Sequence, residues 1–212
     1  MKFLDCVRRG VELYSFVRAL FGVVFSVFFR WRIVGSENIP ASGGAIIAAN
    51  HISNWDPPVI GTAIARPLHF MAKEELFGNA VLRRIITSLG AFPVRRGAAD
   101  RNAIRTAITL LDEGKLLGLF PEGTRSKSGK LGEPEQGLAM IAIKTGVPVI
   151  PAAIIGTNKV FSANCWFPRF EVHFAKPIPV VQGKATKEDI AQLSIAIMEA
   201  IDTLLKNKSS SL

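Results

Sequence analysis

The sequence predicts an α/β fold, with a mixed, largely parallel sheet of about seven strands flanked by helices and preceded by an N-terminal helical segment. Two observations predict it. Short apolar runs alternate along the chain with longer amphipathic stretches, which is the pattern of strands connected by helices. The chain is also 212 residues long, 49% apolar and 20% charged, which is sufficient to bury the core of one domain.

Seven apolar runs are expected as strands: residues 31–34, 45–49, 69–72, 91–94, 116–120, 149–155 and 171–174. Five stretches are expected as helices: residues 57–65, 75–88, 100–113, 135–145 and 187–206. Apolar residues recur every three or four positions from Ile104 to Leu111, which places them on one buried helix face. Gly114 follows as the left-handed residue that ends such a helix. Thr186 and Asp189 resemble a capping box for the last helix, with Asp in place of Glu or Gln.

The N-terminal segment, residues 1–29, is predicted to be an interfacial helix. Residues 19–29 carry no charge, but spanning the hydrocarbon core of a bilayer takes about 20 such residues. Basic residues and Trp31 flank the apolar part, as in helices that lie at a membrane surface. We expect monotopic or peripheral attachment to the cytoplasmic face of the cell membrane. The alternatives are a buried core helix, a true span, or a signal peptide, for which residues 28–31 form a poor cleavage site.

The remaining chain is expected to form one α/β domain over residues 30–207, followed by a disordered tail at 208–212. The formal net charge is +9, which favours anionic partners such as an anionic membrane surface. The absence of a Lys/Arg run and of an aromatic-and-basic RNA module argues against nucleic acid. Cys6 and Cys165 are far apart without CxxC spacing, which suits a reducing compartment. The three histidines are scattered, so no metal site is predicted.

The first candidate site is the segment 50–58, Asn-His-Ile-Ser-Asn-Trp-Asp-Pro-Pro, directly after an apolar run. The ends of strands are where α/β proteins place their sites. His51 can take a proton from an alcohol near neutral pH. Asp56 can hold the other ring nitrogen and stabilise the imidazolium, as the acid of a catalytic triad does. The structural alternative is that Asp56 caps the next helix, with Pro57 as its first residue.

This His–Asp pair comes without a recognisable protein nucleophile. The chain has no GxSxG motif, and nothing marks Ser53 as a nucleophile. It also has no GxxxxGK[ST] motif and no convincing GxGxxG motif, which argues against nucleotide hydrolysis and nicotinamide chemistry. The pair is therefore expected to activate a hydroxyl group of the substrate itself.

The second candidate site is the segment 119–126, Leu-Phe-Pro-Glu-Gly-Thr-Arg-Ser, which also follows an apolar run. Gly123 lets the backbone approach a ligand. Arg125 offers a planar set of donors suited to phosphate, and Thr124 adds a hydroxyl. Glu122 can accept a ligand hydroxyl or orient Arg125. The alternative is an exposed turn with a weak local ion pair.

Further basic residues follow two other apolar runs. Arg95 and Arg96 lie in the segment 90–97 and can join Arg125 around an anion, and Lys73 is another candidate. A solvated basic turn is the alternative. The segment 146–152 has two prolines three residues apart, which predicts an edge or irregular strand. That segment is expected either to pack in the core or to line an acyl pocket.

Taken in order, these segments resemble the glycerolipid acyltransferase superfamily, and within it the bacterial 1-acyl-sn-glycerol-3-phosphate (lysophosphatidic acid) acyltransferases. The superfamily's His-x4-Asp motif matches His51 and Asp56. Its other motifs are similar to residues 90–96, to Phe-Pro-Glu-Gly-Thr-Arg-Ser at 120–126, and to 147–152. Lys73 opens the bacterial Lys-x-Glu-Leu-Phe element. The resemblance covers roughly residues 30–180.

The resemblance implies acyl transfer from an acyl thioester, on acyl-carrier protein or coenzyme A, to the sn-2 hydroxyl of lysophosphatidic acid, giving phosphatidic acid in phospholipid biosynthesis. His51 and Asp56 would be catalytic. The acceptor would be positioned by Glu122, Gly123, Thr124 and Arg125, together with Arg95 and Lys73. No metal or bound cofactor is implied. Alternatives are another acceptor, such as glycerol-3-phosphate or another lyso-lipid, and a non-catalytic peripheral protein that binds anionic lipid.

Overall fold

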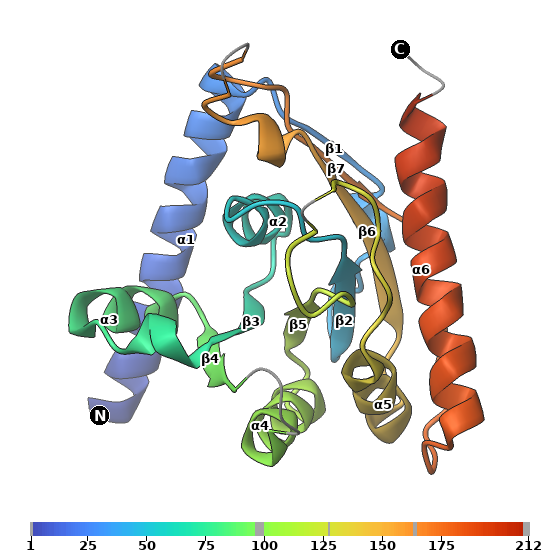
Figure 1. Cartoon of the computed structure of the whole chain (residues 1–212). Coiled ribbons are helices and arrows are strands. Elements are labelled where there is room, and N and C mark those ends of the chain that lie inside the picture. Colours follow the sequence, from blue (N-terminus) through green and yellow to red (C-terminus); the bar gives the residue numbers. More distant parts are fainter. Residues whose placement is uncertain (1, 96–99, 127, 163–164, 210–212) are drawn as a thin grey trace.

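The structure is a computed structural model that describes residues 2–95, 100–126, 128–162 and 165–209. Its centre is one seven-stranded sheet with the order β1-β7-β6-β2-β5-β3-β4 (Figure 1). The strands are β1 Arg32–Val34, β2 Ala45–Ala49, β3 Leu68–Lys73, β4 Ala91–Val94, β5 Leu116–Leu119, β6 Val149–Ile155 and β7 Glu171–Phe174. The five strands from β6 to β4 are mutually parallel, while β7 pairs antiparallel with β6. The predicted fold class is confirmed.

Helices cover both faces of the sheet (Figure 1). They are α1 Lys2–Phe28, α2 Asp56–Ala63, α3 Ala80–Ser88, α4 Arg101–Asp112, α5 Gln136–Thr145 and α6 Lys187–Ser209, with short 3-10 helices η1 Ser36–Asn38, η2 Glu74–Phe77 and η3 Thr157–Lys159. Side chains of β2 alternate between the layers. Ile47 packs with α1 and α2, whereas Ile46 packs with α4, α5 and α6. Because both faces are covered, β2 is apolar throughout, as buried parallel strands are.

Several helix ends follow from local side chains. The Asp100 carboxylate caps α4 by accepting hydrogen bonds from two backbone N–H groups, and Gly114 follows with the expected left-handed φ of 76°. Thr186 and Asp189 form the expected reciprocal cap of α6, with the Asp189 N–H 3.1 Å from Thr186 Oγ1. Helix α6 continues to Ser209, two residues into the segment expected as a tail. Residues 210–212 lie outside the described residues.

Two expectations about regular elements are wrong. Residues 75–88 do not form one helix, because Asn79 adopts an extended backbone and its side chain caps the start of α3. The strand with the two prolines is not an edge strand, because β6 lies between β7 and β2. The carbonyl of Pro151 accepts a hydrogen bond from Ala175, just beyond the end of β7. The N–H and C=O of one strand residue point to the same side, so the N–H that Pro151 lacks would also point toward Ala175. The missing hydrogen bond would therefore lie beyond β7, and no bond between β6 and the residues of β7 is lost.

Over residues 13–28, helix α1 has one buried and one exposed face. The Tyr14 hydroxyl donates to Gly61 O at 3.2 Å and accepts from the Leu68 N–H, which ties α1 to α2 and β3; burial raises the pKa of Tyr14. Phe25 is fully buried and packs edge-on against Phe170. The segment is thus partly a core helix. Among the described residues, no helix combines the length and the apolar character needed to cross a bilayer.

Candidate active site

His51 and Asp56 lie together in the loop that joins the carboxyl end of β2 to α2. His51 Nδ1 is 2.8 Å from Asp56 Oδ2, and both side chains are buried, with His51 7% exposed and Asp56 fully enclosed. A carboxylate only accepts hydrogen bonds, so Nδ1 carries the proton and Nε2 is left as the basic nitrogen. The imidazole stacks on Phe120 with the ring centroids 4.0 Å apart. This packing fixes the ring plane while leaving Nε2 available.

The Asp56 carboxylate is held by four donors. Oδ2 accepts from the backbone N–H groups of Ile52 at 2.6 Å and Ser53 at 2.7 Å as well as from His51, and Oδ1 accepts from the Thr157 hydroxyl at 2.5 Å. Each donor helps to offset the cost of enclosing a charge. The loop is therefore folded around the carboxylate and presents it to the imidazole.

The structural alternative, that Asp56 caps α2, is wrong. Asp56 is the first residue of α2, and its side chain makes no bond to the helix backbone. A capping carboxylate bonds N–H groups two or three residues later. Pro58 has no N–H, and the Val59 N–H already donates to Trp55 O at 2.9 Å. Because no free N–H donor follows Asp56 in the first turn of α2, its carboxylate accepts hydrogen bonds from the preceding loop instead.

Glu122 holds the two site loops together. Its Oε1 accepts from the His51 N–H at 3.1 Å and its Oε2 from the Gly132 N–H at 2.9 Å. The Ser126 N–H adds a bond to His51 O at 2.8 Å. The side chain of Glu122 is buried. Its carboxylate thus sets the backbone position of His51, which is a positioning role.

The turn after Glu122 presents Thr124 and Arg125 to solvent. Gly123 has a φ of +65°, and a Cβ there would lie 2.9 Å from Glu135 Cγ, so the turn requires glycine. Within the described part of the chain, the Arg125 guanidinium has neither an ion pair nor a hydrogen bond. Arg125 therefore precedes the residue whose N–H bonds to His51 O, and its charge is not neutralised by the described residues.

Lys73 and Arg95 lie at the ends of β3 and β4, at the same edge of the sheet as the two site loops. Two and three strand spacings separate these strands from β2, or about 10 and 14 Å. Lys73 Nζ is 3.0 Å from Glu75 Oε1, and Arg95 Nε is 3.8 Å from Asp100 Oδ2. The Lys73–Glu75 pair is exposed and weak. Arg96, the other predicted basic residue, lies outside the described residues.

A hydrogen bond from the backbone N–H of Arg95, together with those from Ala103 and Asn102, lowers the pKa of Asp100. Asp100 therefore remains an anion beside the Arg95 guanidinium. The positive charge of Arg95 is therefore partly neutralised by Asp100, whereas that of Arg125 is not neutralised by any described residue. Of the predicted basic residues that the structure describes, Lys73 and Arg95 each have an ion-pair partner within the described chain, and Arg125 has none.

Sequence reasoning missed Thr157 as a partner of Asp56. Thr157 follows β6, whose carboxyl end lies beside that of β2. The sequence signal that could have identified Thr157 is its position directly after an apolar run. In the neighbouring segment 146–152, residues 149–152 are buried, and Ile150 and Ala152 pack in the layer of α1 and α2. The described residues include no group of three metal-binding side chains.

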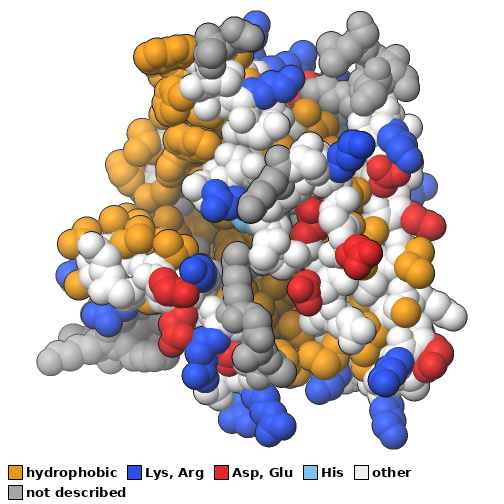
Figure 2. Space-filling model, in the orientation of Figure 1, with side chains coloured by type: hydrophobic (Ala, Val, Ile, Leu, Met, Phe, Trp, Pro, Cys, Tyr) orange, Lys and Arg blue, Asp and Glu red, His pale blue; other side chains and the backbone are white. Residues whose placement is uncertain are grey.

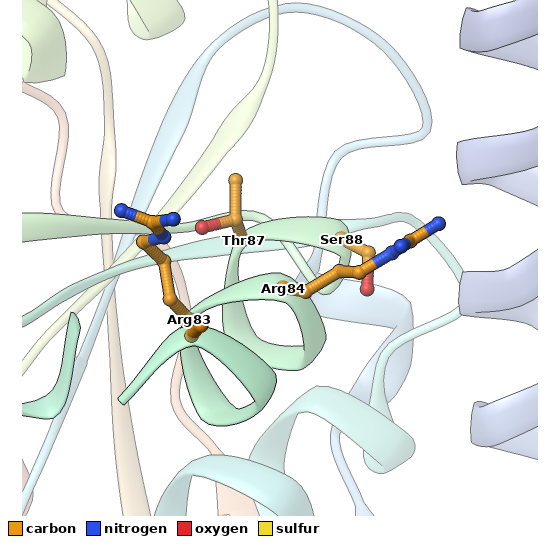
Figure 3. A pocket seen from close by; sticks show the side chains of 5 residues that line it. Arg83, Arg84, Thr87 and Ser88 are labelled. Atoms are coloured by element: carbon orange, nitrogen blue, oxygen red, sulfur yellow. The ribbon is translucent and has the colours of Figure 1, made fainter. Parts of the chain in front are cut away.

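A separate depression lies on α3, away from this site (Figure 3). Ala80, Arg83, Arg84, Thr87 and Ser88 line it. Figure 3 shows the side chains of Arg83 and Arg84 extending away from each other, so they do not converge on one anion. The depression contains none of the residues that surround His51.

Comparisons with known proteins agree with this geometry. Residues 30–155 match the family model described as Acyltransferase. The chain is 35% identical over 148 residues to the 1-acyl-sn-glycerol-3-phosphate acyltransferase of Bacillus subtilis, covering 69% of this chain and 73% of the relative. It is 33% identical over 137 residues to the protein of that name from Borreliella burgdorferi, covering 64% of this chain and about half (55%) of the relative.

A solved structure is also similar. The crystal structure of the 1-acyl-sn-glycerophosphate (LPA) acyltransferase from Thermotoga maritima superposes with a TM-score of 0.75 at 30% identity, covering 94% of this chain and 83% of that one. The matched family region contains the loop with His51 and Asp56 and the loop with Glu122 and Arg125. The chain therefore belongs to the acyltransferase family.

Proposed function

We propose that this protein transfers a fatty acyl group from an acyl thioester to the sn-2 hydroxyl of lysophosphatidic acid, giving phosphatidic acid in phospholipid biosynthesis. The observation that carries the proposal is the His51–Asp56 pair, with Nε2 of His51 unengaged within the described chain and the Arg125 loop beside it. The relatives named as 1-acyl-sn-glycerol-3-phosphate acyltransferases support the choice of acceptor.

The reaction needs a base that later acts as an acid. Nε2 of His51 takes the proton of the acceptor hydroxyl as that oxygen bonds to the thioester carbonyl carbon. Asp56 stabilises the imidazolium that forms at 2.8 Å from its carboxylate. As the tetrahedral intermediate collapses, the carbon–sulfur bond breaks and Nε2 returns the proton to the leaving thiolate. His51 ends in its starting state, so the chemistry requires no metal or bound cofactor.

The acceptor phosphate is assigned to the basic edge of the sheet. Arg125 lies on the loop that bonds directly to the His51 backbone, and Lys73 and Arg95 extend the positive charge toward β4. A guanidinium binds phosphate through two parallel hydrogen bonds. The same charge suits a donor on coenzyme A or on acyl-carrier protein, both of which are acidic.

Replacing Arg125 by alanine is expected to raise the KM for lysophosphatidic acid about 10- to 100-fold with a much smaller change in kcat, because the lost contact binds the phosphate in both ground and transition states. Initial rates at varied acceptor concentration measure this. Arg105→Ala, which removes an exposed arginine of α4, is the matched control. An unchanged KM and rate in Arg125→Ala would contradict the assignment.

The function itself is tested with the purified full-length chain in detergent or vesicles. Acyl-coenzyme A and acyl-carrier protein are each offered with lysophosphatidic acid, glycerol-3-phosphate and other lyso-lipids, and the products are identified by mass spectrometry. We expect phosphatidic acid as the main product. Preferred acylation of glycerol-3-phosphate or another lyso-lipid would replace the acceptor, and lipid binding without any transfer would favour a non-catalytic lipid-binding protein.

An exposed apolar surface supports attachment of the protein to a membrane. It comprises Leu13, Phe16, Leu20, Val23 and Val27 of α1, Val81, Leu82 and Ile85 of α3, and Phe161, Trp166 and Phe167. We name this set the apolar face. Figure 2 shows hydrophobic side chains gathered over α1 and α3. Contiguous apolar surface of this kind marks interaction sites.

The apolar face fits a lipid surface because of what lies around it. The α1 residues recur every three or four positions, so they form one outward stripe, and exposed aromatics are typical of the bilayer interface. Arg83 and Arg84 on α3 carry positive charge beside it, which favours anionic lipid. We infer peripheral attachment at the cytoplasmic face of an anionic membrane, where lysophosphatidic acid is available.

The triple variant Phe16→Ser, Leu20→Ser, Val23→Ser is expected to weaken binding to anionic phospholipid vesicles about 1,000-fold or more, since each buried apolar side chain is worth about 1.5–3 kcal/mol. Deleting residues 1–29 is a poorer test, because Tyr14 and Phe25 belong to the fold. The control Val181→Ser, Ile195→Ser removes exposed apolar residues elsewhere. Cosedimentation measures both, and equal loss in variant and control would refute the assignment.

A further inference from the structure

We propose that Thr157 is a positioning residue of the catalytic site, whose hydroxyl holds the Asp56 carboxylate in the orientation that serves His51. The inference rests on the proposed acyltransfer only for its kinetic consequence, because the contact itself is independent of any substrate. Thr157 lies in none of the segments that the sequence marks as sites, and it is separated from Asp56 by 101 positions in the chain.

The contact is short, buried and directed at one oxygen. Thr157 Oγ1 donates to Asp56 Oδ1 at 2.5 Å, and Thr157 is only 1% exposed. Oδ2 accepts from His51 and from two backbone N–H groups, whereas Thr157 is the partner of Oδ1. A twist of the carboxylate about its bond to the side chain moves both oxygens, so the bond to Oδ1 adds a constraint at the second oxygen to those that already hold Oδ2.

The fold holds Thr157 in place through the end of β6. The Asn50 side chain accepts from the Ile154 N–H at 2.7 Å and donates to its carbonyl at 3.0 Å, which fastens β6 to the residue before His51. Gly156 then turns the chain with a φ of +91°, where a Cβ would lie 2.1 Å from Arg169 O. A residue other than glycine cannot make this turn. Asn50 and Gly156 together aim Thr157 at Asp56.

This arrangement has a clear part in the reaction. When His51 takes the hydroxyl proton, a buried positive ring faces the Asp56 carboxylate across 2.8 Å, and the energy of that pair depends on its geometry. The Thr157 hydroxyl keeps Oδ2 facing Nδ1 and supplies a donor to the charge without exchanging a proton. Thr157 therefore acts through Asp56 and touches no reacting atom.

The primary test is Thr157→Val, which preserves shape and removes the hydroxyl. We expect kcat to fall about tenfold or more, the range for losing a hydrogen bond to a charged group, with the KM values for both substrates within about twofold of wild type. Thr157→Ser, which keeps the donor, is expected to restore most of kcat. Thr157→Ala serves in the same comparison if the valine variant does not fold.

The matched control is Thr62→Val on α2. Thr62 is buried like Thr157, but its hydroxyl donates to the Pro58 carbonyl at 2.7 Å within the helix. We expect it to leave kcat close to wild type. Equal losses in Thr62→Val and Thr157→Val, or a serine variant no better than alanine, would overturn the proposal in favour of a packing role.

A double-mutant comparison separates positioning from packing. If Thr157 acts through the Asp56 carboxylate, Thr157→Val has little further effect on kcat in an Asp56→Asn background, because the group it positions has already lost its charge. Independent packing defects would multiply instead. Full multiplication of the two effects would contradict the inference.

An NMR measurement made without substrate tests the role of Thr157 independently of the proposed acyltransfer. The His51 Nδ1–H proton is followed by NMR of the imidazole-labelled protein; its resonance is expected to shift or broaden in Thr157→Val and to stay in place in Thr62→Val. An unchanged resonance in Thr157→Val would refute the positioning role even in an active enzyme. If wild-type protein acylates no lyso-lipid, the proposed function fails while this measurement still decides the role of Thr157.

Discussion

Replacing His51 by alanine is expected to lower kcat about 1,000-fold or more, while the protein stays folded and bound to membranes. General acid–base catalysis contributes about 10²- to 10⁴-fold, and His51 serves as both base and acid in the proposed reaction. The fold is expected to survive because Asp56 keeps three donors, from Ile52, Ser53 and Thr157, when the imidazole is removed. Steady-state rates, circular dichroism and vesicle cosedimentation measure the three properties.

The control for this variant is His69→Ala. His69 lies on β3, and its Nδ1 is 3.1 Å from the Gly90 carbonyl, so it is an imidazole bonded to backbone instead of to a carboxylate. We expect the control to keep most of the activity. Turnover by His51→Ala at a rate near wild type would remove the proposed mechanism altogether.

Replacing Asp56 by asparagine is expected to lower kcat by about 10² to 10⁴ with only modest loss of stability. The amide oxygen can take the place of Oδ2 and accept from Ile52, Ser53 and His51, and the amide nitrogen can donate to Thr157, whose hydroxyl also accepts. The hydrogen bonds therefore survive, but the negative charge that stabilises the imidazolium is lost, and equivalent losses in other enzymes are of this size.

Asp56→Ala separates the structural part of the contact from the electrostatic part. It leaves the partly buried N–H groups of Ile52 and Ser53 without their acceptor, at a cost of up to about 1–3 kcal/mol each, so its free energy of unfolding should fall below that of Asp56→Asn. Denaturant unfolding measures this difference. A kcat of Asp56→Asn close to wild type would mean that the carboxylate stabilises the loop and does not contribute to catalysis.

Much of the architecture could be predicted from local sequence. All seven strands lie at the expected places. For β2, β5 and β6 the reason is that short apolar runs with both faces buried have few alternatives. The ends of α4 and α6 follow from side chains within one helical turn, such as Asp100 and Thr186. The expected single helix at 75–88 failed because the extended backbone of Asn79 outweighs the apolar pattern around it.

The site was predictable in its parts but not in all its contacts. His51 and Asp56 are five residues apart, so one loop can join them, and their pairing was expected. The clamp of Glu122 on the His51 backbone spans 71 positions. Such a contact depends on which strands are neighbours, and that order is set by packing of the whole sheet.

The order of residues along the chain by itself determined the alternation of strands and helices, the His51–Asp56 pair and the loop with Arg125, because each rests on interactions between residues close in sequence. Only the tertiary structure decided that β6 lies beside β2, and hence that Thr157 reaches Asp56. The physical reason is that a buried carboxylate bonds to whichever donors the packed core brings within reach, and the donor to Oδ1 comes from a part of the chain 101 positions away.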